Sequence, residues 1–482
     1  LTTTFEYELL DQLIRKTEEV AEGHSAVTEY GYDADRNRTF VRFGEATNGD
    51  QPGNVVLTLY DERNLPYREI RGTEDPNTVG DPNVPTSTTQ FNYDRNGNLV
   101  ARIEGLEAGG HATRYIYDCF GRLKYVIDPM GNATTYTYDP AGNQVNERID
   151  GELDDQPGGY GCDLNYLLTG VPPYLCDLPD PTNVRLSETT YVYDELSRLT
   201  RSEVAFFDVT SGAPIDDGLA VTQTFYTPNS LVWKTVDDRG NTTLTTFDTA
   251  NRRSVVTDAK GNTLTYGYDA NGNVMSVTEV EKSDLGSPDQ VFTTTYVYDS
   301  LDRQVAVIDN VGNTNRSYYD SRKNRTRTLD ALNHEVLYQY DGLNRLIRTI
   351  RDMDGSGLGS ADPAAFAGDP ADLEAVLSIV TEQGWDDSSR LVTQTDDNGN
   401  PTMYVYDGLN RKVSEVYADT THKDWTFDAH GNNTFWTDAN ENQVTQIYDD
   451  ADRLTRRDVV VGPGVSDDTT FEVYKYDGLS RL

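Results

Sequence analysis

The stretch YVYDSLDRQVAVIDNVGNTNRSYYD, residues 296–320, contains the unit that decides the fold. One Tyr-Asp pair ends at Asp299, and the next one ends at Asp320. About midway between them stands Asp309, and Gly-Asn follows closely. Turn-forming residues therefore alternate with runs of Val, Ile, Thr and Tyr, which favour strands. The pattern predicts antiparallel strands of about six residues that are joined by short turns.

The unit recurs along essentially the whole chain of 482 residues, often at the interval that separates Asp299 from Asp320. Tyr-Asp, or a variant with Phe or Trp for Tyr, ends at Asp33, Asp61, Asp94, Asp118, Asp139, Asp194, Asp248, Asp269, Asp299, Asp320, Asp341, Asp386, Asp407, Asp428, Asp449 and Asp477. Degenerate copies stand at Tyr7-Glu8 and Tyr226-Thr227. Such a period is typical of a repeat protein, in which each unit buries its apolar face against its neighbours.

The repeated Tyr, Asp and Arg residues have separate expected roles. Tyr should pack along the sheet, and Asp should cap the start of the turn. The structural repeat residues taken as representatives are Tyr117 and Asp118, Tyr138 and Asp139, Tyr298 and Asp299, Tyr340 and Asp341, and Tyr406 and Asp407. In copies of the form YDxxxRL an Arg follows four residues after the Asp and can bridge to its carboxylate. These structural arginines are Arg122, Arg198, Arg345, Arg453 and Arg481.

These units resemble the YD repeats of the RHS family, which includes polymorphic bacterial toxins, the shell-forming components of Tc toxins, and teneurins. The resemblance extends over nearly all of the chain. It implies an all-β fold of tandem antiparallel hairpins, about 21 residues each, that forms a spiral β-sheet ribbon or shell. In family members the shell often encloses a C-terminal toxin domain. The motif DPMG at Asp128 stands inside an ordinary repeat, so no cleavage residues are carried over from the terminal core segment of bacterial members.

The repeat array is expected to run continuously through residues 1–482, as a fragment of a longer protein. Insertions are expected at about residues 62–88, 150–185, 201–220, 279–290 and 351–384. The insertions at 201–220 and 279–290 are expected to be extended hairpins or loops.

The insertion at 351–384 is expected to contain one short helix. Its segment DPADLEAVLSIVTEQG has Asp369 as N-cap, Pro370 at the first helical position and Gly384 after the end. Apolar residues follow a helical spacing at Leu373, Val376, Leu377 and Val380. The helix is expected to pack on its own sheet, with a partner-binding helix as the alternative.

Two further candidate sites lie in the insertions. In RDMDGSGLGSADP, residues 351–363, oxygen ligands alternate as in the start of an EF-hand-like calcium loop. The ligand set is Asp352, Asp354, Ser356 and Asp362, and the alternative is an acidic, glycine-rich turn. Cys162 and Cys176 either form a disulfide, worth roughly 3 kcal/mol, or remain two unpaired thiols. The disulfide would favour an oxidising compartment.

Charge and motif content narrow the function. The chain has 41 Lys and Arg against 80 Asp and Glu, a net charge of -39. Nucleic acid and anionic membrane surfaces are therefore disfavoured as partners. A run of 18 apolar residues is absent from the sequence, so membrane insertion by this segment is not expected. The five histidines are scattered, and HExxH, GxSxG and Walker motifs are absent. The chain is expected not to be an enzyme, with no catalytic residue and no cofactor except calcium at the site above.

The expected function is a structural one: a secreted or cell-surface YD-repeat shell or scaffold whose wall encloses a C-terminal toxin or other cargo. Its partners would be its own C-terminal domain or cargo, with self-assembly or a cell-surface ligand as further candidates. The alternative is a cell-surface adhesin or carbohydrate-binding scaffold. Trp385, Trp425 and Trp436 are the candidate contacts for such a surface, although their place in or near strands favours packing.

Overall fold

A single long β-sheet makes up most of the part of the protein that the structure describes. The computed structural model describes residues 2–76, 85–153, 182–283, 286–352, 378–466 and 470–482. Its 35 described strands belong to one sheet. Every strand pairs antiparallel with the next strand in the sequence, from β1 with β2 to β34 with β35. The prediction of an all-β array of antiparallel hairpins is therefore confirmed.

The strands of the first half are β1 (Thr3–Tyr7), β2 (Leu13–Ala21), β3 (His24–Tyr32), β4 (Arg38–Arg42), β5 (Val55–Tyr60), β6 (Pro66–Arg71), β7 (Ser87–Tyr93), β8 (Leu99–Glu104), β9 (His111–Tyr117), β10 (Leu123–Ile127), β11 (Ala133–Tyr138), β12 (Gln144–Gly151), β13 (Val184–Tyr193), β14 (Leu199–Phe207), β15 (Pro214–Tyr226), β16 (Val232–Val236), β17 (Thr242–Phe247) and β18 (Arg253–Thr257).

The remaining strands are β19 (Thr263–Tyr268), β20 (Val274–Glu281), β21 (Gln290–Tyr298), β22 (Gln304–Ile308), β23 (Thr314–Tyr319), β24 (Arg325–Leu329), β25 (Glu335–Tyr340), β26 (Leu346–Asp352), β27 (Ser378–Trp385), β28 (Leu391–Thr395), β29 (Pro401–Tyr406), β30 (Lys412–Val416), β31 (His422–Phe427), β32 (Asn433–Thr437), β33 (Gln443–Tyr448), β34 (Leu454–Val460) and β35 (Phe471–Val473). The described helical elements are α1 (Gly44–Thr47) and the 3₁₀ turn η2 (Leu106–Ala108). None of them is long or apolar enough to cross a membrane.

The turn after β21 shows how the hairpins close. The backbone N–H of Asp299 donates to the carbonyl of Arg303 at 3.0 Å, and that of Asp302 donates to the carbonyl of Asp299 at 3.1 Å. Asp302 is left-handed at φ 57°, and the strand register shifts at Tyr298. This is a five-residue hairpin turn with a bulge. Gly, Asn, Asp and Ser hold the left-handed position in most other turns, as at Gly312 and Asn344, because Gly, Asn and Asp tolerate it best.

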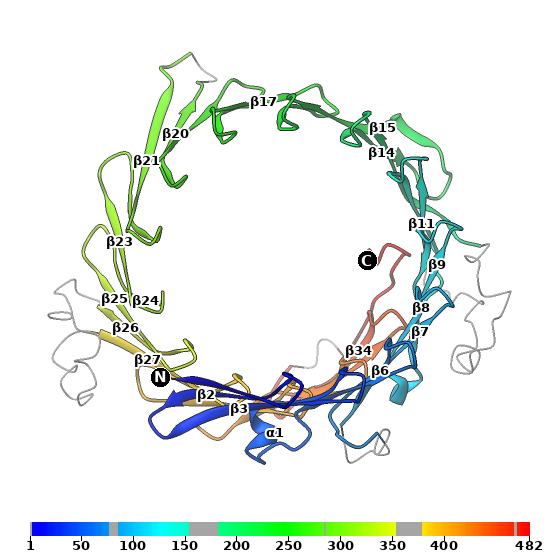
Figure 1. Ribbon diagram of the computed structural model, residues 1–482, viewed down its shortest axis with the longest axis vertical. Helices are drawn as coiled ribbons and strands as arrows, with labels where there is room; N and C mark the ends of the chain where they lie inside the picture. The colour runs from blue at the N-terminus through cyan, green and yellow to red at the C-terminus, as the bar shows by residue number, and fades with distance from the viewer. Residues whose placement is uncertain (1, 77–84, 154–181, 284–285, 353–377, 467–469) are drawn as a thin grey trace.

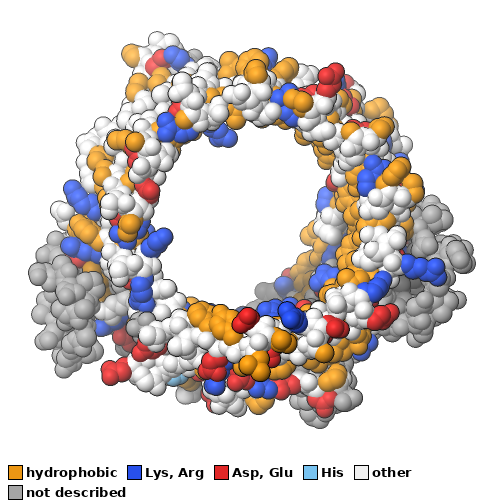
Figure 2. All heavy atoms as spheres, viewed as in Figure 1, with side chains coloured by type: hydrophobic (Ala, Val, Ile, Leu, Met, Phe, Trp, Pro, Cys, Tyr) orange, Lys and Arg blue, Asp and Glu red, His pale blue; other side chains and the backbone are white. Residues whose placement is uncertain are grey.

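The sheet curves into a ring that closes on itself and overlaps (Figure 1). The partners of side-chain hydrogen bonds in the overlap are 334–363 residues apart, so about this length of chain completes one circuit. We call the strands up to β25 the first circuit and those from β26 onward the second circuit. The C-terminus lies inside the ring outline in this view (Figure 1). The space-filling view shows that the middle of the ring is open (Figure 2).

Buried side chains are few because the sheet is one layer thick over much of its length. Within residues 187–283 and 286–334 no residue is buried. The side chains of Ile70, Ile103 and Ile127, by contrast, are fully buried, and these strands belong to the part of the first circuit that the second circuit adjoins. The core therefore lies mainly where two circuits meet.

The predicted helix in the last large insertion is wrong for the part of it that the structure describes. Residues 378–385 form β27, in which Val380 pairs with Ile350 of β26, and β27 also pairs with β28. The β-branched run Ile379, Val380 and Thr381 favours this strand, and pairing on both sides outweighs the apolar spacing of a helix. Residues 369–377 lie outside the described residues. The helical elements that are described, α1 and η2, were not predicted.

Part of the segment 62–88, where an insertion was expected, is regular. Residues 66–71 form β6, which pairs with β5 and β7. In the segment 201–220, expected as an extended hairpin or loop, β14 and β15 pair as a lengthened hairpin, and Figure 1 shows its tip outside the ring. The segment at 279–290 is likewise a lengthened hairpin, from β20 to β21.

The two edges of the ribbon differ in how they accept insertions. We call the edge that carries the turns starting at Tyr-Asp the YD edge. Its turns keep the same five-residue length, as at residues 33–37, 118–122, 299–303 and 449–453. The connections that vary in length all join strands at the opposite edge, namely those between β4 and β5, β6 and β7, β8 and β9, β12 and β13, β14 and β15, β20 and β21, β26 and β27, and β34 and β35. The YD edge is thus the constant element of the fold.

Candidate functional site: the YD-turn latch and the seam

The carboxylate of the repeated Asp organises each YD turn. Asp299 Oδ1 accepts hydrogen bonds from the backbone N–H of Leu301 at 2.9 Å and of Arg303 at 3.1 Å, and its Oδ2 accepts from Arg303 Nε at 2.7 Å. The same contacts recur around Asp118, Asp341 and Asp407. The Arg–Asp bridge expected from the sequence is therefore present.

A latch of two contacts joins this YD turn to the next. Arg303 Nη1 donates to the carbonyl of Asp320 at 2.8 Å, and its guanidinium lies 4.9 Å from the centre of the Tyr319 ring. The Tyr319 hydroxyl in turn donates to the carbonyl of Gln304 at 3.0 Å. The Arg thus reaches forward to the following turn, and the Tyr reaches back to the preceding strand.

The latch recurs along the chain. The forward contact is made by Arg122, Arg198, Arg252, Arg345, Arg390, Arg411 and Arg453. The backward contact is made by Tyr117, Tyr138, Tyr298, Tyr340 and Tyr406 among others, and by Trp385 through its indole N–H. Burial raises the pKa of the Tyr138, Tyr298, Tyr340 and Tyr406 phenols, so these hydroxyls stay protonated donors. Both contacts end on backbone carbonyls and do not depend on neighbouring side chains.

The YD edge of the second circuit packs against the opposite edge of the first circuit, and we call this interface the seam. The backbone N–H of Gly342 donates to the carbonyl of Val20 at 2.9 Å, and that of Gly478 donates to the carbonyl of Glu152 at 2.9 Å. The carbonyl of Gly408 accepts from Asn54 Nδ2 at 3.2 Å. Backbone groups of the two circuits are therefore in direct contact.

Glycine is required at these three positions because the backbones approach so closely. A Cβ atom on Gly342 would lie 2.1 Å from the carbonyl oxygen of Glu19, and one on Gly408 would lie 2.9 Å from Gly53. One on Gly478 would lie 2.8 Å from Gly151 Cα. The other YD turns carry different residues after the Asp. The motif YDGL therefore marks seam turns, and it is a signal in the sequence that the local analysis of the repeats missed.

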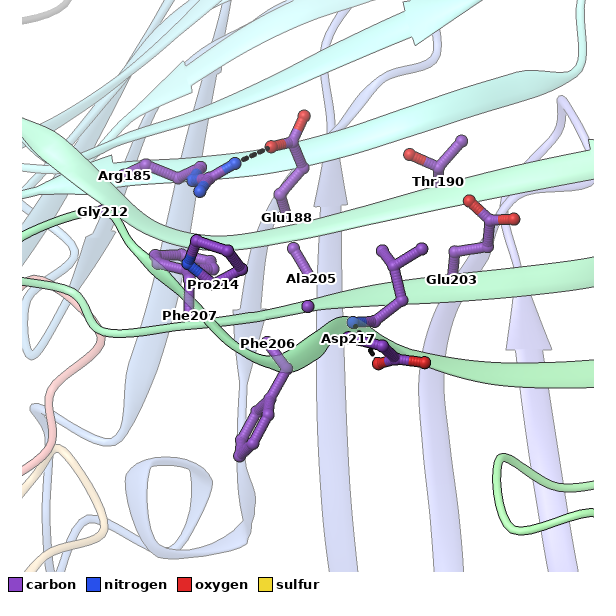
Figure 3. Close-up of a pocket in the computed structure, with 12 residues that line it drawn as sticks. Arg185, Glu188, Thr190, Glu203, Ala205, Phe206, Phe207, Gly212, Pro214 and Asp217 are labelled. Atoms are coloured by element: carbon purple, nitrogen blue, oxygen red, sulfur yellow. Dashed lines mark hydrogen bonds and ion pairs between the residues drawn. The ribbon is translucent and has the colours of Figure 1, made fainter.

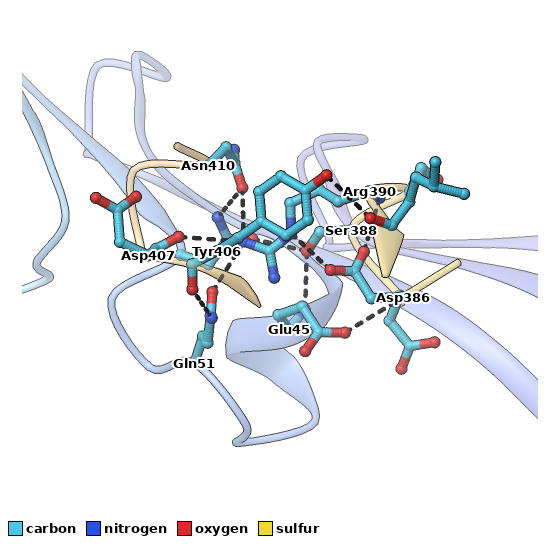
Figure 4. A network of polar contacts seen from close by, with 12 residues as sticks. Glu45, Gln51, Asp386, Ser388, Arg390, Tyr406, Asp407 and Asn410 are labelled. Carbon is cyan, nitrogen blue, oxygen red and sulfur yellow. Dashed lines mark hydrogen bonds and ion pairs between the residues drawn. The ribbon is translucent and has the colours of Figure 1, made fainter. Parts of the chain in front are cut away.

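A buried polar network completes the seam (Figure 4). Asn54 is only 1% exposed; it donates to Asn410 Oδ1 at 2.7 Å and accepts from Ser388 Oγ at 2.7 Å. Glu45 of α1 accepts from the backbone N–H of Asp387 at 2.9 Å, and burial raises the pKa of its carboxyl. The segment 43–54, with α1, thus supplies first-circuit side chains that fit the second-circuit turns.

Arg390 joins the latch to the seam. Its Nε donates to Asp386 Oδ2 at 2.6 Å, and its Nη1 donates to the carbonyl of Asp407 at 3.1 Å. The same Nη1 also donates to Gln51 Oε1 of the first circuit at 2.8 Å. The side chains of Arg390 and Asp386 are only 9% and 8% exposed. This ion pair is therefore buried.

The remaining sequence candidates are placed as follows. Asp352 ends β26 and is buried, while Asp354, Ser356 and Asp362 lie outside the described residues, as do Cys162 and Cys176. Cys119 is an exposed free thiol in a YD turn. Trp425 and Trp436 face each other across β31 and β32, with Lys423 over both rings. These tryptophans take part in cross-strand packing.

Histidines that are far apart in the sequence meet at the seam. His111 of the first circuit stacks on His430 of the second, with ring centres 3.6 Å apart, and Asp452 lies beside them. These histidines look scattered in the sequence, because most of the chain separates them. Only the winding of the ribbon brings them together.

Figure 3 shows a shallow pocket of about 380 Å³ at the β14–β15 hairpin. Arg185 lines it, donates to Glu188 at 2.9 Å and lies 3.9 Å from the centre of the Phe207 ring. The cation of the pocket is thus already paired, and we assign no ligand to it.

Acid is expected to loosen the turns. Hydrogen bonds lower the pKa of the turn carboxyls, chiefly from the Arg303 side chain at Asp299 and from the Asn241 side chain at Asp237. A lowered folded-state pKa gives stability that is present above the unfolded value of about 3.9 and is lost as the pH falls through the folded pKa. Below about pH 4, the backbone amides of residues 299–303 should therefore exchange faster than the intrinsic pH dependence of amide exchange alone would give.

The variant Asp299→Asn tests this origin, since it keeps an acceptor oxygen but cannot titrate. Its turn should be weaker at neutral pH and should show little further loss in acid. Equal acid loss in the variant and the parent would contradict the prediction. At Asp128 the pKa shift has the opposite sign, because burial raises the pKa of its carboxyl.

Comparison with known proteins agrees with the geometry. The RHS repeat family profile matches residues 117–152 and 247–283. A protein of Dickeya dadantii (strain 3937), named probable deoxyribonuclease RhsA, is 29% identical over 174 residues, which are 31% of this chain and 12% of that protein. The matched part is thus a small fraction of that relative's length.

Among solved structures, similar chains include that of TcdB2-TccC3-TEV, with a TM-score of 0.42 and 16% identity over 99% of this chain and 27% of that one. Another is the Photorhabdus luminescens Tc holotoxin pore, with a TM-score of 0.42 and 15% identity over 98% of this chain and 25% of that one. The tandem latched hairpins, the family match and the Rhs relative define a repeat scaffold. The chain thus contains RHS repeats, also called YD repeats, where the family profile matches it.

Proposed function

We propose that the chain is a section of the wall of a hollow shell that encloses a polypeptide cargo, either the C-terminal domain of the same protein or another chain. The observation that carries the proposal is the seam. Successive circuits join edge to edge through Gly342, Gly408 and Gly478, so the ribbon builds a wall. The centre of the ring stays open (Figure 2).

The single-layer sheet supports this function. A solid repeat protein would fill its interior with its own side chains, but residues 187–283 and 286–334 contain no buried residue. The ribbon instead derives its order from hydrogen bonds between strands and from the latches at the YD edge. A wall that does not use the lumen for its own core leaves that volume for cargo.

We further infer that the shell acts outside the cell that makes it, and that this chain performs no reaction. An enzymatic activity, such as the name of the Rhs relative indicates for that protein, would belong to the cargo. The net charge of -39 would keep the wall soluble.

The test uses the full-length protein, with electron microscopy and limited proteolysis in parallel. We expect a closed particle with density inside, and a cargo segment that protease digests at least about tenfold more slowly than the same segment alone, because digestion then requires opening of the wall. The variant Arg390→Met, which weakens the seam, should speed digestion, while Arg252→Met, at the same motif position away from the seam, should not. An open or filamentous particle whose downstream segment is digested at the free rate would overturn the proposal and favour an adhesin.

A further inference from the structure

His111, His430 and Asp452 form a compact cluster across the seam. His111 begins β9 at the opposite edge of the first circuit, whereas His430 and Asp452 belong to two YD turns of the second. The imidazole rings are inclined by 17° to each other, and His111 Nδ1 lies 3.2 Å from Asp452 Oδ1. One potential ligand atom from each of the three residues lies within 4.8 Å of the others.

The ring nitrogens of this cluster are buried without satisfying partners. His430 Nδ1 and Nε2 and His111 Nδ1 make no hydrogen bond among the described residues, since the 3.2 Å contact of His111 Nδ1 with Asp452 Oδ1 lacks hydrogen-bond geometry. Buried polar atoms in proteins are nearly always hydrogen-bonded, and leaving one unpaired costs about 1–3 kcal/mol. Three such atoms in one place therefore point to a ligand that these nitrogens bind.

The backbone makes room for this arrangement. Gly105, at φ 61°, lies against the His430 ring, and a Cβ atom at this position would lie 2.5 Å from that ring.

We propose that His111, His430 and Asp452 bind a divalent transition-metal ion, with Zn²⁺ as the best match, and that this ion ties the two circuits together. Two imidazoles and a carboxylate form a typical zinc donor set. Asp450, whose Oδ1 lies 3.8 Å from His111 Nε2, or a water molecule would supply the fourth ligand. Binding requires the two rings to rotate so that their lone pairs converge, with ligand atoms about 3.3 Å apart at bond lengths near 2.0–2.1 Å. This site does not depend on whether the shell holds cargo.

The experiment titrates the chain with Co²⁺ in excess Mg²⁺, which occupies surface carboxylates. We expect one Co²⁺ per chain, with the visible absorption of a tetrahedral ion, and displacement by Zn²⁺. His111→Gln and His430→Gln should each weaken binding by at least about 100-fold, since losing a ligand costs no less than losing an outer-shell partner. Bound Zn²⁺ should also slow hydrogen exchange in residues 105–111 and 428–432.

His422→Gln is the matched control, because His422 also lies beside an acid, 3.2 Å from Asp424, but away from the seam. It should bind Co²⁺ like the parent. Gly105→Ala keeps every ligand but displaces the His430 ring, so it should also weaken Co²⁺ binding. This result would distinguish binding at the histidine site from binding to acidic groups elsewhere on the surface. Absence of stoichiometric binding at micromolar Co²⁺, or equal affinity in the parent and both His→Gln variants, would overturn the proposal.

Discussion

Arg390→Met is expected to destabilise the seam by about 3–5 kcal/mol, the cost of leaving one partner of a buried ion pair without the other. The variant removes the guanidinium that binds Asp386 and the contacts to the Asp407 carbonyl and Gln51. The Asp386 side chain, 8% exposed, would then be a buried charge without its cation. Native-state hydrogen exchange of residues 386–390 and 404–411 should report the loss as faster opening.

Arg252→Met provides the matched control for this variant. Arg252 occupies the same motif position, pairs with Asp248 through Nε and makes the same forward contact to the Asp269 carbonyl, but it lies away from the seam and its side chain is 34% exposed. An exposed pair contributes about 0–1 kcal/mol, so the control should change exchange little. Equal effects of the two substitutions would mean that burial at the seam does not govern the strength of the latch.

Gly342→Val is expected to open the seam at β2 and β3 and to cost about 2–4 kcal/mol, from a forced steric overlap and the loss of a backbone hydrogen bond. The new Cβ would lie 2.1 Å from the Glu19 carbonyl oxygen, so the Gly342 N–H could no longer reach Val20. Peptides covering residues 17–24 and 338–346 should exchange faster. The hairpin of β25 and β26 itself should remain folded.

Ala270→Val is the control for the glycine variant, because Ala270 is exposed at the same position of a YD turn away from the seam. It adds similar bulk to the turn and should leave exchange nearly unchanged. If Gly342→Val left residues 17–24 as protected as in the parent, the close approach of the two circuits would not be a stabilising contact.

Most of the local structure could be predicted from the sequence because each hairpin is determined by residues a few positions apart. Asp299 caps its own turn, Asp302 occupies the left-handed position, and Arg303 pairs with Asp299. The helix error at Val380 has the same local origin, since an apolar spacing fits a helix while β-branched residues fit a strand. Pairing with β26 and β28, which no local pattern reports, decides between them.

The seam could not be predicted, because its partners come from different circuits and are separated by most of the chain. Nothing near His111 in the sequence points to His430, and nothing near Asn54 points to Asn410. The curvature of the ribbon is the sum of small contributions from many hairpins, and this sum determines which parts of the two edges come into contact. The glycine of YDGL is the local sequence feature that indicates this contact. The neighbouring backbone of the other circuit requires glycine there, whereas the geometry of its own turn does not.

The pairing of every strand with its sequence neighbours also determines the order in which the molecule can assemble. A hairpin forms in roughly 1–10 μs once its residues are available, whereas a contact between distant residues must first overcome the entropy of closing the loop. The ribbon can therefore grow from one end as the chain emerges, and each latch fixes the angle of the newest hairpin. The circumference of the ring is then determined by local contacts, before the seam contact between Gly342 and Val20 forms. A change in one repeat therefore alters which residues of the first circuit the second circuit contacts.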